Sequence, residues 1–190
     1  MKKIIILIPI YNDWESFNKL IFEISKIIEK IDYFKFDCIL VNDASSIDKP
    51  KLKKPENFNS LKILHMKTNK GHARCNAFGL RYISENENFD NLILMDGDGE
   101  DRPIEINSLT QKIKENPNHS VVAKRVKRSE GAFFRFLYFM HKLITLIFTG
   151  KSINFGNYSC LTKNDVNTIA SKVSIWSSYS GTLKRYVSLL

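Results

Sequence analysis

The residues best suited to chemistry lie in one short segment, LILMDGDGEDRP at residues 92–103. Asp96 and Asp98 stand two positions apart directly after an apolar run, so in an extended backbone their carboxylates point the same way. Gly97 and Gly99 let the backbone turn tightly beside a ligand. Carboxylates on a short loop are hard oxygen ligands for Mg²⁺ or Mn²⁺, ions that keep positions open for water and phosphate. The segment therefore predicts a metal site.

Two other interpretations of this loop can be weighed from the sequence. An EF-hand loop that began at Asp96 would need Gly at its sixth position and Glu at its twelfth. These positions hold Asp101 and Asn107, so an EF-hand is excluded. A solvated acidic turn is the other alternative, and the strongly apolar strand before the loop favours the metal site over it.

The first half of the chain alternates between strand and helix patterns. Continuous apolar runs indicate strands covered on both faces, and apolar residues at helical spacing indicate amphipathic helices. The strands are predicted at 4–8, 36–41, 61–66 and 91–95, and the helices at 17–31 and 72–84. Asn12 and Glu15 have the spacing of a capping pair for the first helix. We therefore expect an α/β fold with a mostly parallel central sheet flanked by helices.

The second half continues with less regular patterns. We expect a helix up to residue 115, a strand at 119–124, a long helix at 131–148, a strand near 158–161 and a helix from Lys163. The tail from Trp176 to Leu190 fits more than one structure. No internal repeat or interdomain linker is present, so residues 1–190 are expected to form a single domain. Three scattered cysteines without CxxC spacing indicate reduced thiols rather than a disulfide framework or a zinc site.

Polar loops follow the four predicted strands of the first half. They cover residues 9–13, 42–46, 67–74 and 96–102. Because the carboxyl ends of parallel strands meet at one edge of a sheet, these four loops predict a ligand site at that edge.

Three of these loops carry residues suited to a nucleotide. Tyr11 could stack on a base, and Asp43 could accept a hydrogen bond from a base or a ribose hydroxyl. The alternatives are that Tyr11 only packs against its neighbours and that Asp43 is a turn residue or a helix cap. Lys70 and Arg74 flank the start of a predicted helix, where free backbone N–H groups and the helix dipole also favour an anion.

The chain has 190 residues and a formal net charge of +9, and this charge is unevenly distributed. Residues 1–101 contain 15 basic and 16 acidic residues, whereas residues 102–190 contain 14 basic and 4 acidic residues. A basic region of this kind attracts phosphates, whether in nucleic acid, a lipid head group or a membrane surface. The sequence has no RNA-binding aromatic motif or helix-turn-helix pattern, so nucleic acid is not an expected partner.

Four segments of the first half resemble family 2 glycosyltransferases with the GT-A fold, a Rossmann-like α/β fold. They are IPIYND, LVNDASS, NKGHARCNAFGL and LMDGDGEDRP, in this order and at similar spacings. The second half, with VVAKRVKRSEGAFFRFLYFMHKLITLIFTG and INFGNYSC, looks like the branch that acts on polyprenyl phosphates, such as dolichyl- or undecaprenyl-phosphate sugar transferases. By this resemblance, residues 1–101 would be the nucleotide-sugar and metal half, and residues 102–190 the acceptor half.

The resemblance also implies roles for particular residues. Asp96 and Asp98 would be the DxD motif, acting in catalysis and as ligands of Mg²⁺ or Mn²⁺, with Glu100 as a third candidate ligand. Seven residues from the four loops would bind the nucleotide sugar, namely Pro9, Tyr11, Asp13, Asp43, Lys70, Arg74 and Asp96. The sequence departs from the family pattern at Asp13, where relatives usually have Glu, at Asn42, which replaces the first Asp of a common Asp-Asp pair, and at Glu100, where lipid-phosphate relatives often have Gln.

The basic residues after the fifth predicted strand fit a phosphate acceptor. Arg125, Arg128 and Arg135 are the candidate ligands of that phosphate, since Arg can grip a phosphate bidentately. A solvated charged face is the alternative. The helix expected at 131–148 fits either a membrane interface or a buried core, and both interpretations stay open. A phosphomonoester, with a second pKa of about 6, can attack without a catalytic base, and the acceptor half has no obvious base motif.

Together these patterns predict an inverting, metal-dependent glycosyltransferase. It would move a sugar from a UDP- or GDP-sugar to polyprenyl phosphate at the cytoplasmic face of the cell membrane, in cell-surface glycan biosynthesis. One alternative is transfer to a hydroxyl of a growing surface glycan, with Asp101 or Glu100 as the base. The other is a non-catalytic basic module for anionic membrane or nucleic acid.

Lipid-phosphate relatives commonly continue into C-terminal helices, so we expect a chain that ends at Leu190 to be truncated. The oligomeric state of the protein stays open.

Overall fold

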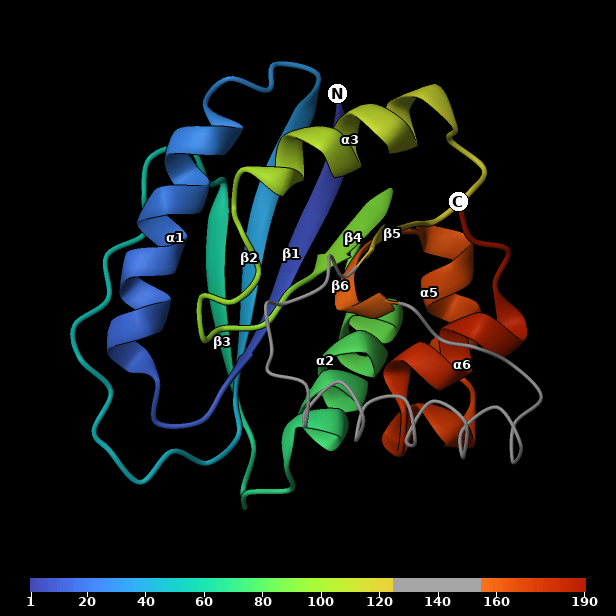
Figure 1. Ribbon diagram of the computed structural model, residues 1–190. Coiled ribbons are helices and arrows are strands. Elements are labelled where there is room, and N and C mark those ends of the chain that lie inside the picture. Colours follow the sequence, from blue (N-terminus) through green and yellow to red (C-terminus); the bar gives the residue numbers. More distant parts are fainter. Residues whose placement is uncertain (125–154) are drawn as a thin grey trace, which may run out of the picture.

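A six-stranded sheet organises the computed structural model, which describes residues 1–124 and 155–190 (Figure 1). Its strands are β1 (Lys2–Ile10), β2 (Phe34–Asn42), β3 (Ser60–His65), β4 (Asn91–Leu94), β5 (Val121–Lys124) and β6 (Phe155–Thr162). Within the described ranges they lie in the order β3-β2-β1-β4-β6-β5. β1 to β4 pair in parallel, and β6 runs antiparallel to both β4 and β5. The predicted α/β fold with a mostly parallel sheet is confirmed.

Helices cover both faces of this sheet. They are α1 (Trp14–Ile28), α2 (His72–Asn86), α3 (Glu105–Glu115), α5 (Lys163–Ala170), the 3₁₀ helix η1 (Val173–Trp176) and α6 (Tyr179–Tyr186). Side chains of α1 and α3 join the core cluster on one face, and side chains of α2, α5, η1 and α6 join the cluster on the other. Figure 1 shows how these helices lie around the sheet. The sheet is therefore buried from both sides, as an open parallel sheet requires.

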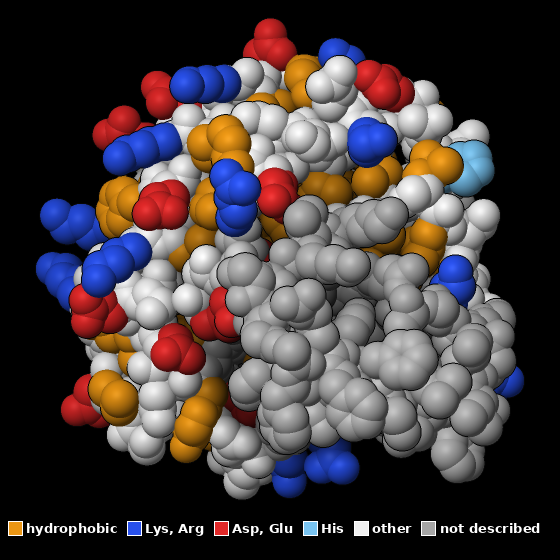
Figure 2. Space-filling model, viewed as in Figure 1, with side chains coloured by type: hydrophobic (Ala, Val, Ile, Leu, Met, Phe, Trp, Pro, Cys, Tyr) orange, Lys and Arg blue, Asp and Glu red, His pale blue; other side chains and the backbone are white. Residues whose placement is uncertain are grey.

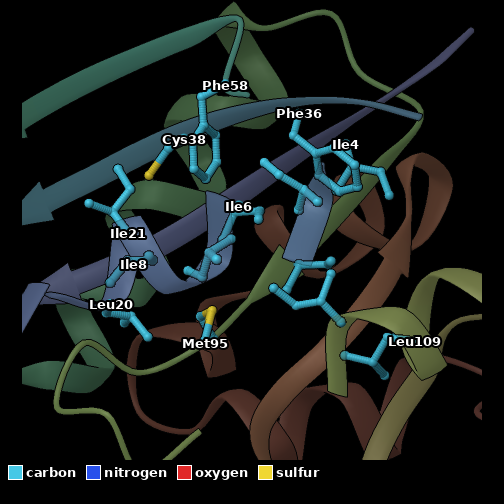
Figure 3. Packing of buried hydrophobic residues seen from close by; sticks show 14 of the residues in the cluster. Ile4, Ile6, Ile8, Leu20, Ile21, Phe36, Cys38, Phe58, Met95 and Leu109 are labelled. Atoms are coloured by element: carbon cyan, nitrogen blue, oxygen red, sulfur yellow. The ribbon is translucent and has the colours of Figure 1, made fainter. Parts of the chain in front are cut away.

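The apolar run at the start of the chain forms a central strand because both of its faces are covered. Ile4, Ile6 and Ile8 belong to the cluster beside α1 and α3, which Figure 3 shows from close by. Ile5 and Leu7 belong to the cluster beside α2. All five side chains are fully buried, and the burial of one such side chain contributes about 1.5–3 kcal/mol. This alternation explains why the run has no polar residue.

The outer surfaces of α1 and α3 are polar. Lysine, arginine, aspartate and glutamate side chains are interspersed over them (Figure 2). Glu15 and Lys19, one turn apart on α1, form an exposed ion pair of 2.7 Å. Such a mixture of signs is the solvated face of an amphipathic helix.

One local prediction is wrong, because Asn12 does not cap α1. The cap position is held by Asp13, whose side chain makes no capping hydrogen bond. Asn12 has a φ of 63°, and its Oδ1 accepts hydrogen bonds from the backbone N–H groups of Ser46 (2.8 Å) and Ile47 (3.2 Å). Asn12 therefore joins the loop after β1 to the loop after β2.

The second half is partly described. The strand predicted near 158–161 is the longer β6, and the ambiguous tail starts at Trp176, the last residue of η1, and contains α6. The helix predicted at 131–148, and with it Arg125, Arg128 and Arg135, lies outside the described residues. Over the ranges 1–124 and 155–190, no helix has both the length and the apolar character needed to cross a membrane.

The three cysteines are all buried and free. They are Cys38, Cys75 and Cys160. Burial raises the pKa of each thiol, in the case of Cys75 to about 12. The thiols are therefore protonated at neutral pH and pack as small apolar side chains.

Candidate active site

The polar loops that follow the parallel strands meet around one cavity. It has a volume of about 490 Å³. Its lining consists of Pro9, Ile10, Tyr11, Asp13, Asp43, Asn69, Gly71, His72, Cys75, Asp96, Gly97, Asp98, Glu100 and Asn157. All four loops predicted to converge contribute residues to this lining, so their convergence is confirmed. The volume lies within the range of about 300–1,000 Å³ that is usual for small-molecule sites.

The structure brings together most of the residues predicted for the site. Pro9, Tyr11, Asp13, Asp43, Asp96, Asp98 and Glu100 all line the cavity. Lys70 and Arg74 are exposed and are not part of the lining, although Gly71 and His72 between them are. The predicted acceptor residues Arg125, Arg128 and Arg135 lie outside the described residues. The roles assigned to all these residues stay predictions.

A second cavity of about 490 Å³ lies at the edge strand β3. Its lining combines lysines with apolar residues, namely Lys49, Pro50, Lys51, Leu52, Lys54, Leu61 and Ile63. No carboxylate, imidazole or hydroxyl group is among them. The cavity at the carboxyl ends of the strands is therefore the candidate active site, because it is the one that contains groups able to bind a metal or move a proton.

Tyr11 and Asp43 occupy opposite kinds of environment within the site. Tyr11 is 45% exposed, which leaves its ring available to stack on a base. Asp43 is 3% exposed, and its two carboxylate oxygens accept hydrogen bonds from the backbone N–H groups of Lys70 and Gly71, each at 2.8 Å. The carboxylate thus fixes the loop that leads into α2. Each oxygen keeps a second lone pair, so a further contact with a ligand is still possible.

We expect Asp43→Ala to lower the free energy of unfolding by about 1.5–3 kcal/mol, because two backbone N–H groups lose a charged acceptor. Urea denaturation measures this loss. Asp48→Ala is the control, since it removes an exposed carboxylate from the same loop. If the Asp43 and Asp48 variants unfold at the same urea concentration, Asp43 does not anchor the loop.

The two glycines of the DGDG loop are required for different reasons. A Cβ at Gly97 would lie 2.8 Å from the backbone oxygen of Pro9 and 2.8 Å from Cγ2 of Ile10, so only glycine fits beside the end of β1. Gly99 has a φ of 83°, in the left-handed region that favours glycine. Next to it, the Glu100 N–H donates to Oδ1 of Asp98 at 2.9 Å. The loop therefore turns tightly while it presents Asp96 and Asp98 to the cavity.

The carboxylates of this loop fit one mode of metal binding. Among the described residues, no three His, Cys, Asp or Glu side chains are grouped closely enough to hold an ion by themselves. Mg²⁺ is usually held by one or two carboxylates together with waters and substrate phosphates, rather than by a cage of protein ligands. Asp96, Asp98 and Glu100 line one cavity, as that mode requires. The residues therefore suit an ion that arrives with a phosphate ligand.

His72 and Asn157 are site residues that the sequence prediction missed. His72 Nε2 lies 3.2 Å from Oδ1 of Asp96 and 2.8 Å from Nδ2 of Asn157. Nδ2 of Asn157 lies 3.1 Å from Oδ1 and 3.4 Å from Oδ2 of Asp96. The hydrogen bond to Asp96, aided by the negative charge of neighbouring carboxylates and opposed by burial, raises the pKa of His72. In the sequence, His72 appeared only as part of an anion-binding helix start, and Asn157 only within the INFGNYSC segment.

The family of the chain follows from a match over most of its length. The family model of glycosyl transferase family 2 matches residues 5–175. The chain therefore belongs to glycosyl transferase family 2.

Several solved structures share its fold. Residues 1–349 of S. aureus TarS superpose with a TM-score of 0.58 at 14% sequence identity, over 99% of this chain and 58% of TarS 1–349. The same TarS fragment in complex with UDP gives 0.58 at 17% identity, over 99% of this chain and 57% of the fragment. A mycobacterial protein gives 0.54 at 13% identity, over 86% of this chain and 54% of its own. These likenesses show the GT-A fold, and the chain spans about 58% of the TarS fragment. No curated protein matches the sequence significantly.

Proposed function

We propose that the chain transfers a sugar from a nucleotide-diphosphate sugar to polyprenyl phosphate, with inversion at the sugar carbon. One observation supports a nucleotide-diphosphate sugar as the donor. The aromatic ring of Tyr11 and the carboxylates of Asp96 and Asp98 line the same cavity. An aromatic ring suits a base, and acidic groups suit a metal-bound diphosphate. Solved structures of TarS in complex with UDP and with UDP-GlcNAc support a uridine donor, although GDP fits the same chemistry.

A divalent ion, Mg²⁺ or Mn²⁺, is included in this proposal. When bound, it would neutralise the negative charge that develops on the departing diphosphate. Asp96 and Asp98 would hold it, with Glu100, which lines the same cavity, as a further candidate. These residues would also orient the donor. Gly97, which lies between Asp96 and Asp98, packs against the end of β1 and so fixes the position of their loop.

The proposal that polyprenyl phosphate is the acceptor rests on the positive charge of the second half of the chain. Residues 102–190 contain 14 basic and 4 acidic residues, and a phosphomonoester with a second pKa of about 6 is already ionised at neutral pH. Arg125, Arg128 and Arg135 would bind this phosphate. A lipid-linked acceptor places the reaction at the cytoplasmic face of the cell membrane, in cell-surface glycan biosynthesis.

A second candidate is transfer to a hydroxyl of a growing surface glycan. A hydroxyl needs a base to remove its proton. Glu100 favours this alternative, because its carboxylate lines the cavity.

The test is sugar transfer from radiolabelled UDP- and GDP-sugars to undecaprenyl phosphate, with Mg²⁺ or Mn²⁺, followed by partition into organic solvent. We expect lipid-linked product with the wild-type chain. The double variant Arg128→Ala plus Arg135→Ala should form about 10²–10⁴-fold less, because it loses two charge-assisted contacts worth about 1.5–3 kcal/mol each. It should still bind nucleotide.

The matched control is Arg81→Ala plus Arg185→Ala, which removes two exposed arginines that do not line the cavity. If nucleotide binding and transfer fall together in the Arg128 and Arg135 variant, the acceptor role is wrong. A water-soluble product alone would establish the glycan acceptor instead. Salt-sensitive nucleic-acid binding that is indifferent to Asp98, with no affinity for nucleotide sugars, would indicate a non-catalytic basic module.

A further inference from the structure

Three elements that are distant in the sequence bring polar side chains together at one wall of the cavity. His72 lies in the first turn of α2, Asp96 follows β4, and Asn157 lies on β6. β6 pairs with β4 in antiparallel orientation, and this pairing brings Asn157 beside Asp96. A fourth residue, Asn76, lies one turn further along α2, with its Nδ2 3.0 Å from Nε2 of His72.

The chemistry of these groups determines where the proton of the imidazole lies. An ionised carboxylate can only accept hydrogen bonds, so the contact of 3.2 Å between His72 and Asp96 requires a proton on Nε2. The Asn157 amide N–H then cannot donate to that nitrogen and donates to the Asp96 carboxylate instead. Nδ2 of Asn76 also lies near this nitrogen, at 3.0 Å, and Oδ1 of Asn76 is buried with no hydrogen-bond partner among the described residues.

Two donors from two different elements therefore act on a single carboxylate. Nε2–H of His72 and Nδ2 of Asn157 both reach Oδ1 of Asp96, at 3.2 and 3.1 Å. The backbone N–H of Asp96 is itself fixed, since it donates to Oδ2 of Asp101 at 2.8 Å. With its backbone and its side chain held, Asp96 has little freedom to rotate within the cavity wall.

We propose that His72 and Asn157 are positioning residues that set the orientation of the Asp96 carboxylate for binding of the metal–nucleotide donor. This inference rests on the proposed function. Neither residue needs to touch the donor, because each acts through Asp96. Groups that orient a ligand of a metal in this way typically affect affinity or activity by about 10–100-fold.

The test compares two amide substitutions at position 72 by their affinity for UDP in the presence of Mn²⁺. The side chain of Gln places its amide nitrogen near the position of Nε2, whereas that of Asn reaches only as far as Nδ1. We expect His72→Asn to lose affinity about 10–100-fold and His72→Gln to recover most of it. Both variants lose the imidazole and its charge, so a role in packing or as a cation would weaken both equally.

Asn157→Ala is expected to show the same loss as His72→Asn, again about 10–100-fold. Asn167→Ala is the matched control, because it likewise removes an Asn amide that takes part in a side-chain hydrogen bond, from Ser84 at 2.8 Å, and Asn167 does not line the cavity. Thermal unfolding of each variant shows whether it is folded.

The outcomes separate this inference from the function on which it rests. If the wild-type chain binds neither UDP nor GDP with Mn²⁺ or Mg²⁺, the proposed function is wrong and the inference fails with it. If the wild type binds and the His72→Asn and Asn157→Ala variants bind equally well, only the inference is wrong. Equal losses in His72→Gln and His72→Asn would also overturn it.

Discussion

Asp98→Asn should lower sugar transfer by about 10³-fold, because a metal-bound diphosphate loses several kcal/mol of charge stabilisation and about 1.4 kcal/mol corresponds to a factor of ten. The substitution is conservative in structure. Asp98 is exposed, and its Oδ1 accepts a hydrogen bond from the Glu100 N–H at 2.9 Å. An Asn side chain offers a carbonyl oxygen at the same place, so the turn of the loop is retained. What is removed is a negative charge and a ligand oxygen.

The measurement combines transfer from a radiolabelled UDP-sugar with titration of UDP in the presence and absence of Mn²⁺. The wild type should bind UDP more tightly with the ion, and Asp98→Asn should lose this difference. Asp32→Asn serves as control, because it removes an exposed carboxylate from the loop before β2, at the opposite end of the strand. Unchanged turnover in both Asp98→Asn and Asp96→Asn would exclude the metal-dependent mechanism.

The part of the site that the sequence predicts is the part encoded by local pattern. A strand buried on both faces needs an unbroken apolar run, as in Ile4–Ile8, and a polar loop after such a strand must emerge at the carboxyl edge of the sheet. Pro9, Tyr11, Asp43 and Asp96 could therefore be assigned to one rim without knowledge of the strand order.

The part that the sequence does not predict depends on pairing between distant segments. Asn157 reaches Asp96 because β6 inserts between β4 and β5 and runs against them, and no local pattern states where a strand inserts in a sheet. Asn12 is a second example. An Asn before a helix favours both a cap and a left-handed turn. The backbone N–H groups of Ser46 and Ile47, more than 30 residues away, donate hydrogen bonds to the Asn12 side chain. These hydrogen bonds stabilise the left-handed turn, so Asn12 does not act as a cap.

Gly97→Ala tests how closely the carboxylate loop must approach β1. An added Cβ would lie 2.8 Å from the backbone oxygen of Pro9 and 2.8 Å from Cγ2 of Ile10. The isoleucine side chain could move, but the backbone oxygen lies near the end of a strand that is hydrogen-bonded in the middle of the sheet. The loop must therefore shift away from β1, and Asp96 and Asp98 shift with it because they flank the substituted residue.

We expect Gly97→Ala to reduce sugar transfer by about 10²-fold, the usual effect of a displacement of about 1 Å in a catalytic group, and to lower the free energy of unfolding by about 1–3 kcal/mol. Gly99→Asn is the matched control in the same loop. Among the described residues, no atom beyond Gly99 and its two chain neighbours lies within 4 Å of a Cβ at Gly99, and Asn tolerates the left-handed backbone that this position requires. Transfer assays and urea denaturation of both variants show whether an effect comes from crowding between Gly97 and β1 or from any substitution in this loop. Equal activity in the two variants would show that the contact between Gly97 and Pro9 does not set the position of the carboxylates.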